Sequence, residues 1–303
     1  MTADLTILAM PKPFTGHIGI IQRNAITSWT KLHPRPEITI FGTEEGAADC
    51  ASSLGLVHIP EVARNEYGTP LLADIFAQAE RSSASALFAY VNADIILPGS
   101  FTAGIEIVRK KFLQFLAVGR RTNLDVRETI DFSSEWEAPL LERMRREGQL
   151  ESHTGIDFFA FPRGTYFDVP PLAIGRVWFD QWCVKYARKR GIPVVDMTPF
   201  SPIVHQLHHY DHVAGGKQRV YAGPEADENL VYYGSRPHAY TILSATHELQ
   251  PHGSLKRKLF RRELLAAREW AWEIFVNKTH PLRRRLGLSR SATLAADPKE
   301  RGS

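Results

Sequence analysis

Along the first part of the chain, segments with the hydrophobic pattern of a strand alternate with segments that have the hydrophobic spacing of a helix. Apolar runs of strand length occur at 5–10, 37–41 and 57–59, and apolar residues with helical spacing occur at 17–32 and 44–54. Strands that alternate with helices in this way are typical of a parallel α/β sheet. We therefore expect the chain to begin as an α/β fold.

The alternation continues to about residue 200. The sequence predicts helices at 70–81, 101–111, 135–147 and 179–190, and strands at 87–97, 112–119, 155–161 and 192–196. Residues 198–240 are rich in Pro, Gly, His and Tyr and predict long loops, which in a compact enzyme are often functional.

The predicted strand at 87–97 is apolar except at Asn92 and Asp94. Two residues that are two apart on a strand point to the same side, so an amide oxygen and a carboxylate can converge on one hard cation that holds a diphosphate. Alternatively, the two residues only end the strand, because Pro-Gly-Ser follows at 98–100 and favours a turn.

Composition places the chain among ordinary globular proteins. With 303 residues, 44% hydrophobic residues and a mean hydropathy of −0.22, it predicts one large domain with an appendage. Two cysteines are too few for a disulfide framework and suggest a reducing compartment. No apolar run resembles a signal sequence or approaches the roughly 18 residues of a membrane span, so we expect a cytoplasmic protein.

The net charge of +4 hides an asymmetry, because residues 254–303 hold thirteen Lys or Arg and only five Asp or Glu. A basic tail on a mildly acidic body argues against a nucleic-acid reader. From Leu255 the tail predicts an amphipathic helix, which would either lie on an anionic membrane or pack on its own domain.

Four features in order resemble the GT-A fold of nucleotide-sugar glycosyltransferases, in particular the family 2 group and its relatives. They are Pro11 at the end of the first strand, Glu44-Glu45 after the second, Gly68 at a helix start, and Asn92-Ala93-Asp94 at the end of a buried strand. The resemblance covers residues 5–200. It implies a mainly parallel nucleotide-binding sheet flanked by helices, with a D-x-D-like motif that holds Mn²⁺ or Mg²⁺ under the donor diphosphate. Asn92 departs from the motif, in which many members have Asp.

The resemblance also implies where the donor binds. Pro11 and Lys12 would line the donor pocket, Glu44 and Glu45 would lie near the base and ribose, and Asp94 would bind the metal with help from Asn92. The two glutamates are equally compatible with a role in favouring a helix dipole. Arg120 and Arg121, just past a predicted strand end, would contact phosphate or be solvated surface residues.

Four histidines occur in the eight residues 205–212. A helix would place all four on one face as a transition-metal site, whereas a loop could return to Asp94 and supply His205 or His212 as a metal ligand. Pro199 and Pro202 favour the loop, so we predict His205 as the ligand. The third interpretation is a set of surface histidines with structural hydrogen bonds.

The acceptor side is predicted from residues 173–182, which resemble the acidic motif that opens a helix beside the acceptor. Asp180 is the predicted base for an inverting transfer, and Asp157 is the second carboxylate candidate. Trp178 and Trp182 are four apart and could stack on a sugar ring, although aromatic residues at helical spacing are more often core.

These features predict a metal-assisted glycosyltransferase that moves a sugar from a nucleoside diphosphate to a hydroxyl of a glycan or lipid-linked acceptor, cytoplasmic and in peripheral contact with the inner face of the membrane. Residues 1–250 would form the catalytic domain, with a nucleotide-sugar half at 1–121 and a loop-rich acceptor half at 122–250. A basic amphipathic helical extension would occupy 251–288 and a disordered tail 289–303.

Three alternatives remain open. A nucleotidyltransferase would need a Gly-rich phosphate loop where Pro11-Lys12-Pro13 stands. A non-catalytic module could keep the sugar-nucleotide fold and be recruited by its basic tail. A histidine-based hydrolase would require bound zinc.

Overall fold

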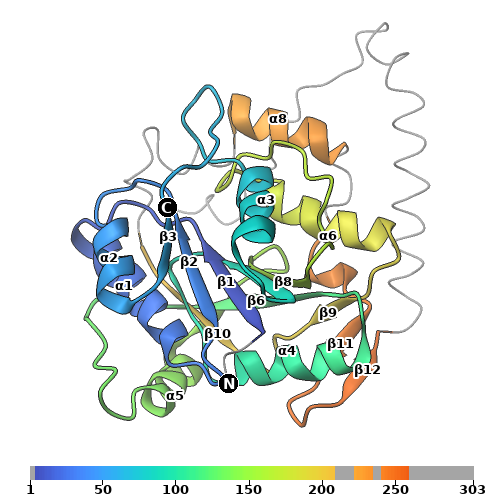
Figure 1. Cartoon of the computed structure of the whole chain (residues 1–303). Coiled ribbons are helices and arrows are strands. Elements are labelled where there is room, and N and C mark those ends of the chain that lie inside the picture. The colour runs from blue at the N-terminus through green and yellow to red at the C-terminus, as the bar shows by residue number, and fades with distance from the viewer. Residues whose placement is uncertain (1–3, 209–221, 235–239, 259–303) are drawn as a thin grey trace, which may run out of the picture.

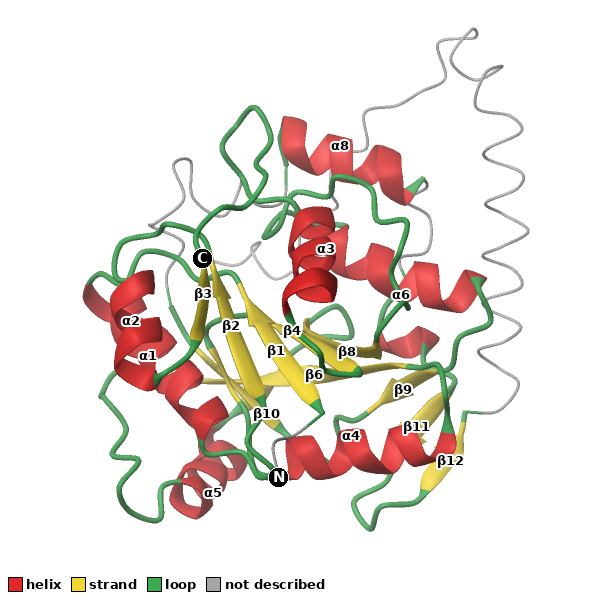
Figure 2. Cartoon of the chain, viewed as in Figure 1, coloured by secondary structure: helices red, strands yellow, loops and turns green. Residues whose placement is uncertain are grey.

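The computed structural model describes residues 4–208, 222–234 and 240–258. Within these ranges a twisted central sheet runs through the molecule and carries helices on both faces (Figures 1 and 2). Its strands are β1 (Leu5–Ala9), β2 (Glu37–Phe41), β3 (Val57–Ile59), β4 (Leu87–Val91), β5 (Ile95–Ile96), β6 (Leu116–Leu124), β7 (Gln149–Leu150), β8 (Ile156–Pro162), β9 (Val194–Asp196), β10 (Ile203–Gln206), β11 (His247–Leu249) and β12 (Leu255–Arg257). The helices are α1 (Gly16–Thr30), α2 (Ala47–Leu54), α3 (Leu72–Ser82), α4 (Ser100–Lys111), α5 (Glu137–Glu147), α6 (Phe179–Lys189), α8 (Pro224–Tyr233) and the short 3₁₀ helix η1 (Ile242–Ser244).

The strand order along the main sheet is β12-β11-β9-β6-β8-β4-β1-β2-β3. Strands β3, β2, β1 and β4 are parallel, as are β6, β9 and β11, and β8 is antiparallel to both of its neighbours. The predicted α/β class with a mainly parallel sheet is therefore confirmed.

Alternating side chains of β1 enter two separate cores, one on each face of the sheet. Ile7 packs in a cluster with Trp29 of α1, and Leu8 packs in another with Phe76 of α3. Because every residue of β1 is buried, its apolar run is continuous, as expected for a parallel strand covered on both faces.

Three sequence predictions are wrong in detail. The strand expected at 87–97 stops at Val91, a turn follows, and the chain resumes as β5, which leaves the β4 direction to pair with β10. The region 198–240, expected as loops, contains β10 and α8. Arg120 and Arg121 lie within β6 and not beyond its end.

The predicted helix from Leu255 is also wrong at its start, because residues 255–257 form β12, which pairs with β11 in a hairpin connected by residues 250–254. The apolar-polar order of Leu255 and Lys256 fits a strand as well as a helical turn. Pairing with β11 stabilises the strand. The rest of the predicted helix and the predicted disordered tail lie outside the described residues. Among the described residues, no helix has both the length and the apolar character needed to cross a membrane.

Candidate functional site

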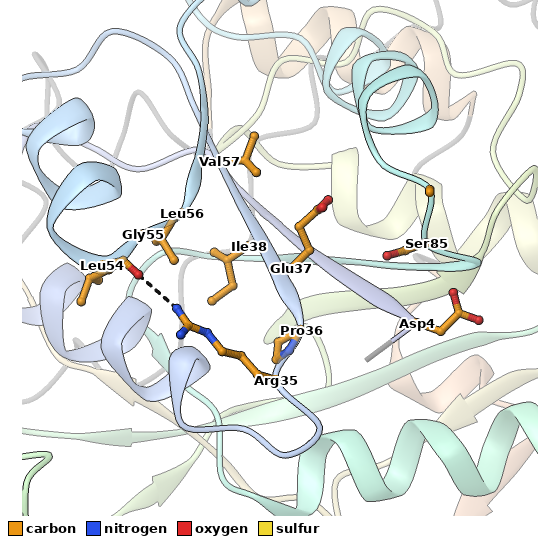
Figure 3. A pocket seen from close by; sticks show the side chains of 11 residues that line it. Asp4, Arg35, Pro36, Glu37, Ile38, Leu54, Gly55, Leu56, Val57 and Ser85 are labelled. Atoms are coloured by element: carbon orange, nitrogen blue, oxygen red, sulfur yellow. Dashed lines mark hydrogen bonds between the residues drawn. The ribbon is translucent and has the colours of Figure 1, made fainter. Parts of the chain in front are cut away.

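Among the described residues, hollows lie at both ends of the parallel strands, and two of them are considered as sites. The first, of about 620 Å³, opens at the amino ends of β1 and β2 (Figure 3). Its charged groups already have partners: Arg35 donates to the carbonyl of Leu54 at 3.0 Å, and Asp4 pairs with Arg109 at 3.1 Å. This hollow offers no converging reactive groups.

The second hollow, of about 590 Å³, lies at the carboxyl ends of β1 and β4, the edge where ligands bind in open α/β sheets. Polar and charged side chains from distant parts of the chain meet in its wall. They include Lys12, Gln22, Glu44, Asn92, Asp94, Arg121, Glu151, Asp157, Arg176, Asp180, His205 and His208. We call this hollow the central cavity.

The segment after β1 brings Lys12 into the central cavity. Gln22 of α1 holds its backbone on both sides: the Lys12 N–H donates to Gln22 Oε1 at 2.6 Å, and Gln22 Nε2 donates to the Lys12 carbonyl at 2.8 Å. Burial and the charge of Arg121 lower the pKa of the Lys12 amine, against the opposing effect of Asp94 and Asp157. A cation held in a partly buried cavity is suited to an anionic ligand.

Asp94, His205 and His208 meet at one side of the central cavity. Asp94 Oδ2 lies 3.1 Å from His208 Nε2 and 3.7 Å from His205 Nε2, and one ligand atom from each residue lies within 4.8 Å of the others. The turn after β4 makes this possible, because it directs the chain into β5, whose Ile95 is registered with His205 of β10.

These three residues fit a divalent cation. Burial opposes ionisation of Asp94, but His205, the hydrogen bond from His208 and the charge of Lys12 outweigh it and hold the pKa of Asp94 well below its usual value. Burial lowers the pKa of His205, which favours the neutral imidazole that ligates metals. Asp94 Oδ1 is buried and has no hydrogen-bond partner among the described residues, as expected of an atom reserved for a ligand.

Asn92 and Asp94, expected on one face of a strand, have separate surroundings because the strand ends before them. Asn92 Nδ2 donates to Asp157 Oδ1 at 2.8 Å. Arg121 donates to the same oxygen at 2.9 Å, and Asp157 Oδ2 is buried with no hydrogen-bond partner among the described residues. The structure thus gives Asn92 a hydrogen-bonding role toward Asp157.

Asp180 lies in the first turn of α6 and lines the central cavity. Burial, together with the nearby charge of Asp157, raises the pKa of its carboxyl group to about 7, although hydrogen bonds from backbone N–H groups oppose the shift. A carboxyl group with a pKa near neutrality can accept a proton efficiently.

The other predicted site residues divide into two groups. Pro11 and Glu44 line the central cavity, and Glu44 pairs with Arg64 at 2.8 Å. Glu45, Arg120, Trp178 and Trp182 do not line it.

The two tryptophans lie in aromatic surroundings. Trp182 is 8% exposed and packs on Tyr186, with ring centroids 4.9 Å apart. Trp178 packs on Tyr233 of α8 at 5.0 Å. Both side chains thus pack on aromatic residues and neither lines the central cavity, which agrees with the core-packing alternative; acceptor stacking stays a prediction.

Sequence reasoning missed several residues of the central cavity. His208 was considered only as part of a possible helical metal site at 205–212, and Glu151 and Arg176 of the cavity wall were not singled out. Asn123, which contacts His205 but does not itself line the cavity, was not singled out either. Asn123 lies two residues after Arg121 on β6, a spacing that would have signalled a shared face once the strand was extended. His209 and His212 lie outside the described residues.

The fold matches solved nucleotide-sugar transferases. TarS residues 1–349 of S. aureus, solved in complex with UDP-GlcNAc, superposes with a TM-score of 0.52 at 10% identity, over 77% of this chain and 66% of that one, just under two thirds of its length. Glucosyl-3-phosphoglycerate synthase of Mycobacterium tuberculosis, solved with Mn²⁺, UDP and phosphoglyceric acid, gives 0.42 at 11% identity, over 77% and 79%. A putative nucleotide-diphospho-sugar transferase from Desulfovibrio desulfuricans gives 0.42 at 10% identity, over 77% and 99%.

No protein-family model and no curated protein sequence matches the chain. The fold itself is of the GT-A type, as the resemblance in sequence predicted.

Proposed function

We propose that this protein is a glycosyltransferase that moves a sugar from a nucleoside-diphosphate donor to a hydroxyl acceptor. The observation that carries the proposal is the meeting of Asp94, His205 and His208 in the central cavity of a GT-A fold. The match to TarS, solved with UDP-GlcNAc, supports a sugar nucleotide as the donor and makes uridine diphosphate sugars the first to test.

Asp94, His205 and His208 would hold the metal, which when bound neutralises charge on the diphosphate leaving group. The donor set favours Mn²⁺ over Mg²⁺, because imidazole suits transition metals and carboxylate suits Mg²⁺ and Mn²⁺ alike. Lys12 and Arg121 supply further positive charge toward the phosphates.

Asp180 would act as the base in an inverting transfer. The bond between the anomeric carbon and the diphosphate oxygen breaks, the acceptor oxygen forms a new bond to that carbon, and the acceptor proton passes to the Asp180 carboxylate. The products are a glycoside and a nucleoside diphosphate. A pKa near 7 supports this role, because the group is ionised for part of the population at neutral pH and can still bind a proton.

A glycan or lipid-linked hydroxyl is the proposed acceptor, with the protein in the cytoplasm and in peripheral contact with the membrane. The excess of basic residues in 254–303 supports attraction to an anionic lipid surface. Flotation with vesicles that contain anionic lipid, at low and high salt, tests this part. Retention that is lost at high salt supports it, and absence of flotation at both salt concentrations contradicts it.

A donor-hydrolysis assay tests the reaction class. The protein is incubated with a panel of nucleoside-diphosphate sugars, with and without Mn²⁺, and the released phosphates are separated. Release of nucleoside diphosphate that depends on Mn²⁺ and is lost in Asp94→Ala is expected. A parallel incubation supplies nucleoside triphosphates and sugar phosphates. Release of pyrophosphate there would instead indicate a nucleotidyltransferase, and absence of both activities would indicate a non-catalytic module.

A further inference from the structure

The strands beside the central cavity place four polar residues in a row. Strands β7, β6, β10 and β5 are consecutive neighbours in the sheet. Their register pairs Asn123 with Gln149 on one side and with His205 on the other, and pairs His205 with Ile95. Glu151 follows β7 and Asp94 precedes β5, so the row runs from Glu151 through Asn123 and His205 to Asp94.

Hydrogen bonds join Glu151, Asn123 and His205 and fix the orientation of the Asn123 amide and the His205 ring, while His205 Nε2 lies 3.7 Å from Asp94 Oδ2. Asn123 Nδ2 donates to Glu151 Oε2 at 3.0 Å, and a carboxylate can only accept. The amide nitrogen of Asn123 therefore faces Glu151 and its Oδ1 faces His205. Oδ1 lies 2.8 Å from His205 Nδ1, so this nitrogen must carry a hydrogen and donate it.

Glu151 is well suited to anchor the row. Although burial opposes its ionisation, the Ser152 N–H, Asn123 and Arg121 lower its pKa to about 2. Arg121 also contacts it at 3.4 Å and so connects the row to Asp157. An ionised Glu151 is a pure acceptor, so it holds the Asn123 amide in one of its two orientations.

We propose that the Glu151–Asn123 pair positions His205 for a cation by holding the hydrogen on Nδ1 and leaving Nε2 to ligate. Glu151 and Asn123 are positioning residues, since neither belongs to the set of Asp94, His205 and His208 whose ligand atoms converge. The inference rests on the proposed metal site of the GT-A enzyme, but it concerns how this chain prepares that site. Partners of this kind commonly change metal affinity about 10- to 100-fold.

The first test reads the His205 tautomer directly, without metal or substrate. Two-dimensional long-range ¹⁵N–¹H spectra of the metal-free protein, labelled with ¹⁵N-histidine and assigned with His205→Gln, show which ring nitrogen carries the hydrogen in the neutral form. A hydrogen on Nδ1 is the expected result. A neutral ring with its hydrogen on Nε2 would overturn the proposal whatever the variants do.

The second test measures Mn²⁺ affinity by electron paramagnetic resonance of free Mn²⁺, with no sugar nucleotide present. Asn123→Leu keeps the size of the side chain and removes the acceptor, and is expected to weaken Mn²⁺ binding about 10- to 100-fold. The double variant Asn123→Asp with Glu151→Gln exchanges amide and carboxylate, restores an acceptor for His205 Nδ1, and is expected to bind Mn²⁺ within a few-fold of the unaltered protein.

Thr122→Val is the matched control on the same strand and should leave Mn²⁺ affinity unchanged. Thermal melting of each variant separates loss of affinity from loss of fold. If Asn123→Leu melts as a folded protein and binds Mn²⁺ as tightly as the unaltered chain, the pair has no positioning role, while the proposed metal site and transferase function would stand. If the unaltered chain binds no Mn²⁺, this inference and the proposed metal site fall together, and donor hydrolysis decides separately whether the transferase function survives.

Discussion

Asn92 donates its side-chain N–H to Asp157 Oδ1 at 2.8 Å, and the Arg121 guanidinium donates to the same oxygen at 2.9 Å. An aspartate at position 92 would place a second carboxylate against Asp157 and could not donate. The departure of this chain from the D-x-D pattern therefore has a local physical cause, namely that the residue two positions before Asp94 donates a hydrogen to the buried carboxylate of Asp157.

Asn92→Asp, which recreates the D-x-D motif, is accordingly expected to destabilise the protein by about 1–3 kcal/mol at neutral pH, because it removes one of the two donors to the buried Asp157 carboxylate and adds a like charge beside it. Chemical denaturation at pH 7 measures the free energy of unfolding. The double variant Asn92→Asp with Asp157→Asn, which exchanges the two groups, should recover part of the loss. A single variant as stable as the unaltered chain would show that the contact does not explain the asparagine.

Asp180→Asn tests the proposed base. Transfer by the unaltered enzyme should rise with pH through about 7 as the carboxyl ionises, and the variant should lose about 10²- to 10⁴-fold in kcat with the nucleotide affinity kept. Steady-state kinetics from acid to mildly alkaline pH provide the profile. A variant that keeps full turnover and the same profile would remove Asp180 from the reaction.

The same carboxyl group makes stability depend on pH with a definite sign. Its pKa is raised from 3.8 to about 7 in the folded state, so the folded protein holds a proton that the unfolded chain releases. This contribution to stability is present at acid pH and is lost as pH rises from about 4 to 7. Asp180→Asn cannot lose it, so the melting temperature of the variant relative to the unaltered protein should increase over that range. A constant difference between the two melting curves would contradict the shift.

Sequence patterns predicted secondary structure correctly where tertiary contacts did not change the local conformation. The strands at 37–41 and 57–59 have the predicted bounds, because both runs carry β-branched apolar residues at alternate positions, a strand signal that does not depend on the neighbouring strands. In contrast, the end of the strand at Val91 depends on Asn92 and β10, which pairs with β5 from more than a hundred residues away. No local pattern carries that information.

Residues of the candidate site could be predicted from sequence only where the residue type itself is unusual for its position. Asp94 and His205 were selected because a carboxylate ending a buried strand and a cluster of histidines are unusual, and the structure brings them within 3.7 Å. Asn123 and Glu151 are ordinary polar residues whose role arises from strand register. The sequence left the role of Trp182 open between core packing and acceptor binding, because helical spacing fits a core face and a binding face equally well.

Trp182→Ala is expected to lower the free energy of unfolding by about 3–5 kcal/mol, since it removes a large side chain that is 8% exposed within an aromatic cluster. Trp182→Phe should retain most of the packing and lose less. Urea denaturation of both variants gives the comparison. An alanine variant of full stability with weakened acceptor binding would favour the stacking role instead.

His208→Ala is expected to abolish most of the thermal stabilisation that Mn²⁺ gives. Stabilisation by a ligand of the folded state grows with the logarithm of the ligand concentration divided by Kd, so weaker Mn²⁺ binding gives a smaller rise in melting temperature. His33→Ala, which alters an exposed histidine outside the central cavity, is the control and should respond to Mn²⁺ like the unaltered protein. Equal Mn²⁺ responses in both variants would remove His208 from the proposed metal site.

The central claim is that Asp94, His205 and His208 hold a cation beside a sugar-nucleotide diphosphate. Crystals grown with Mn²⁺ and a nucleoside-diphosphate sugar, measured at the manganese absorption edge, test it most directly. One anomalous peak is expected within coordination distance of all three side chains and of the donor phosphates. A manganese peak or a donor bound away from these residues would contradict it.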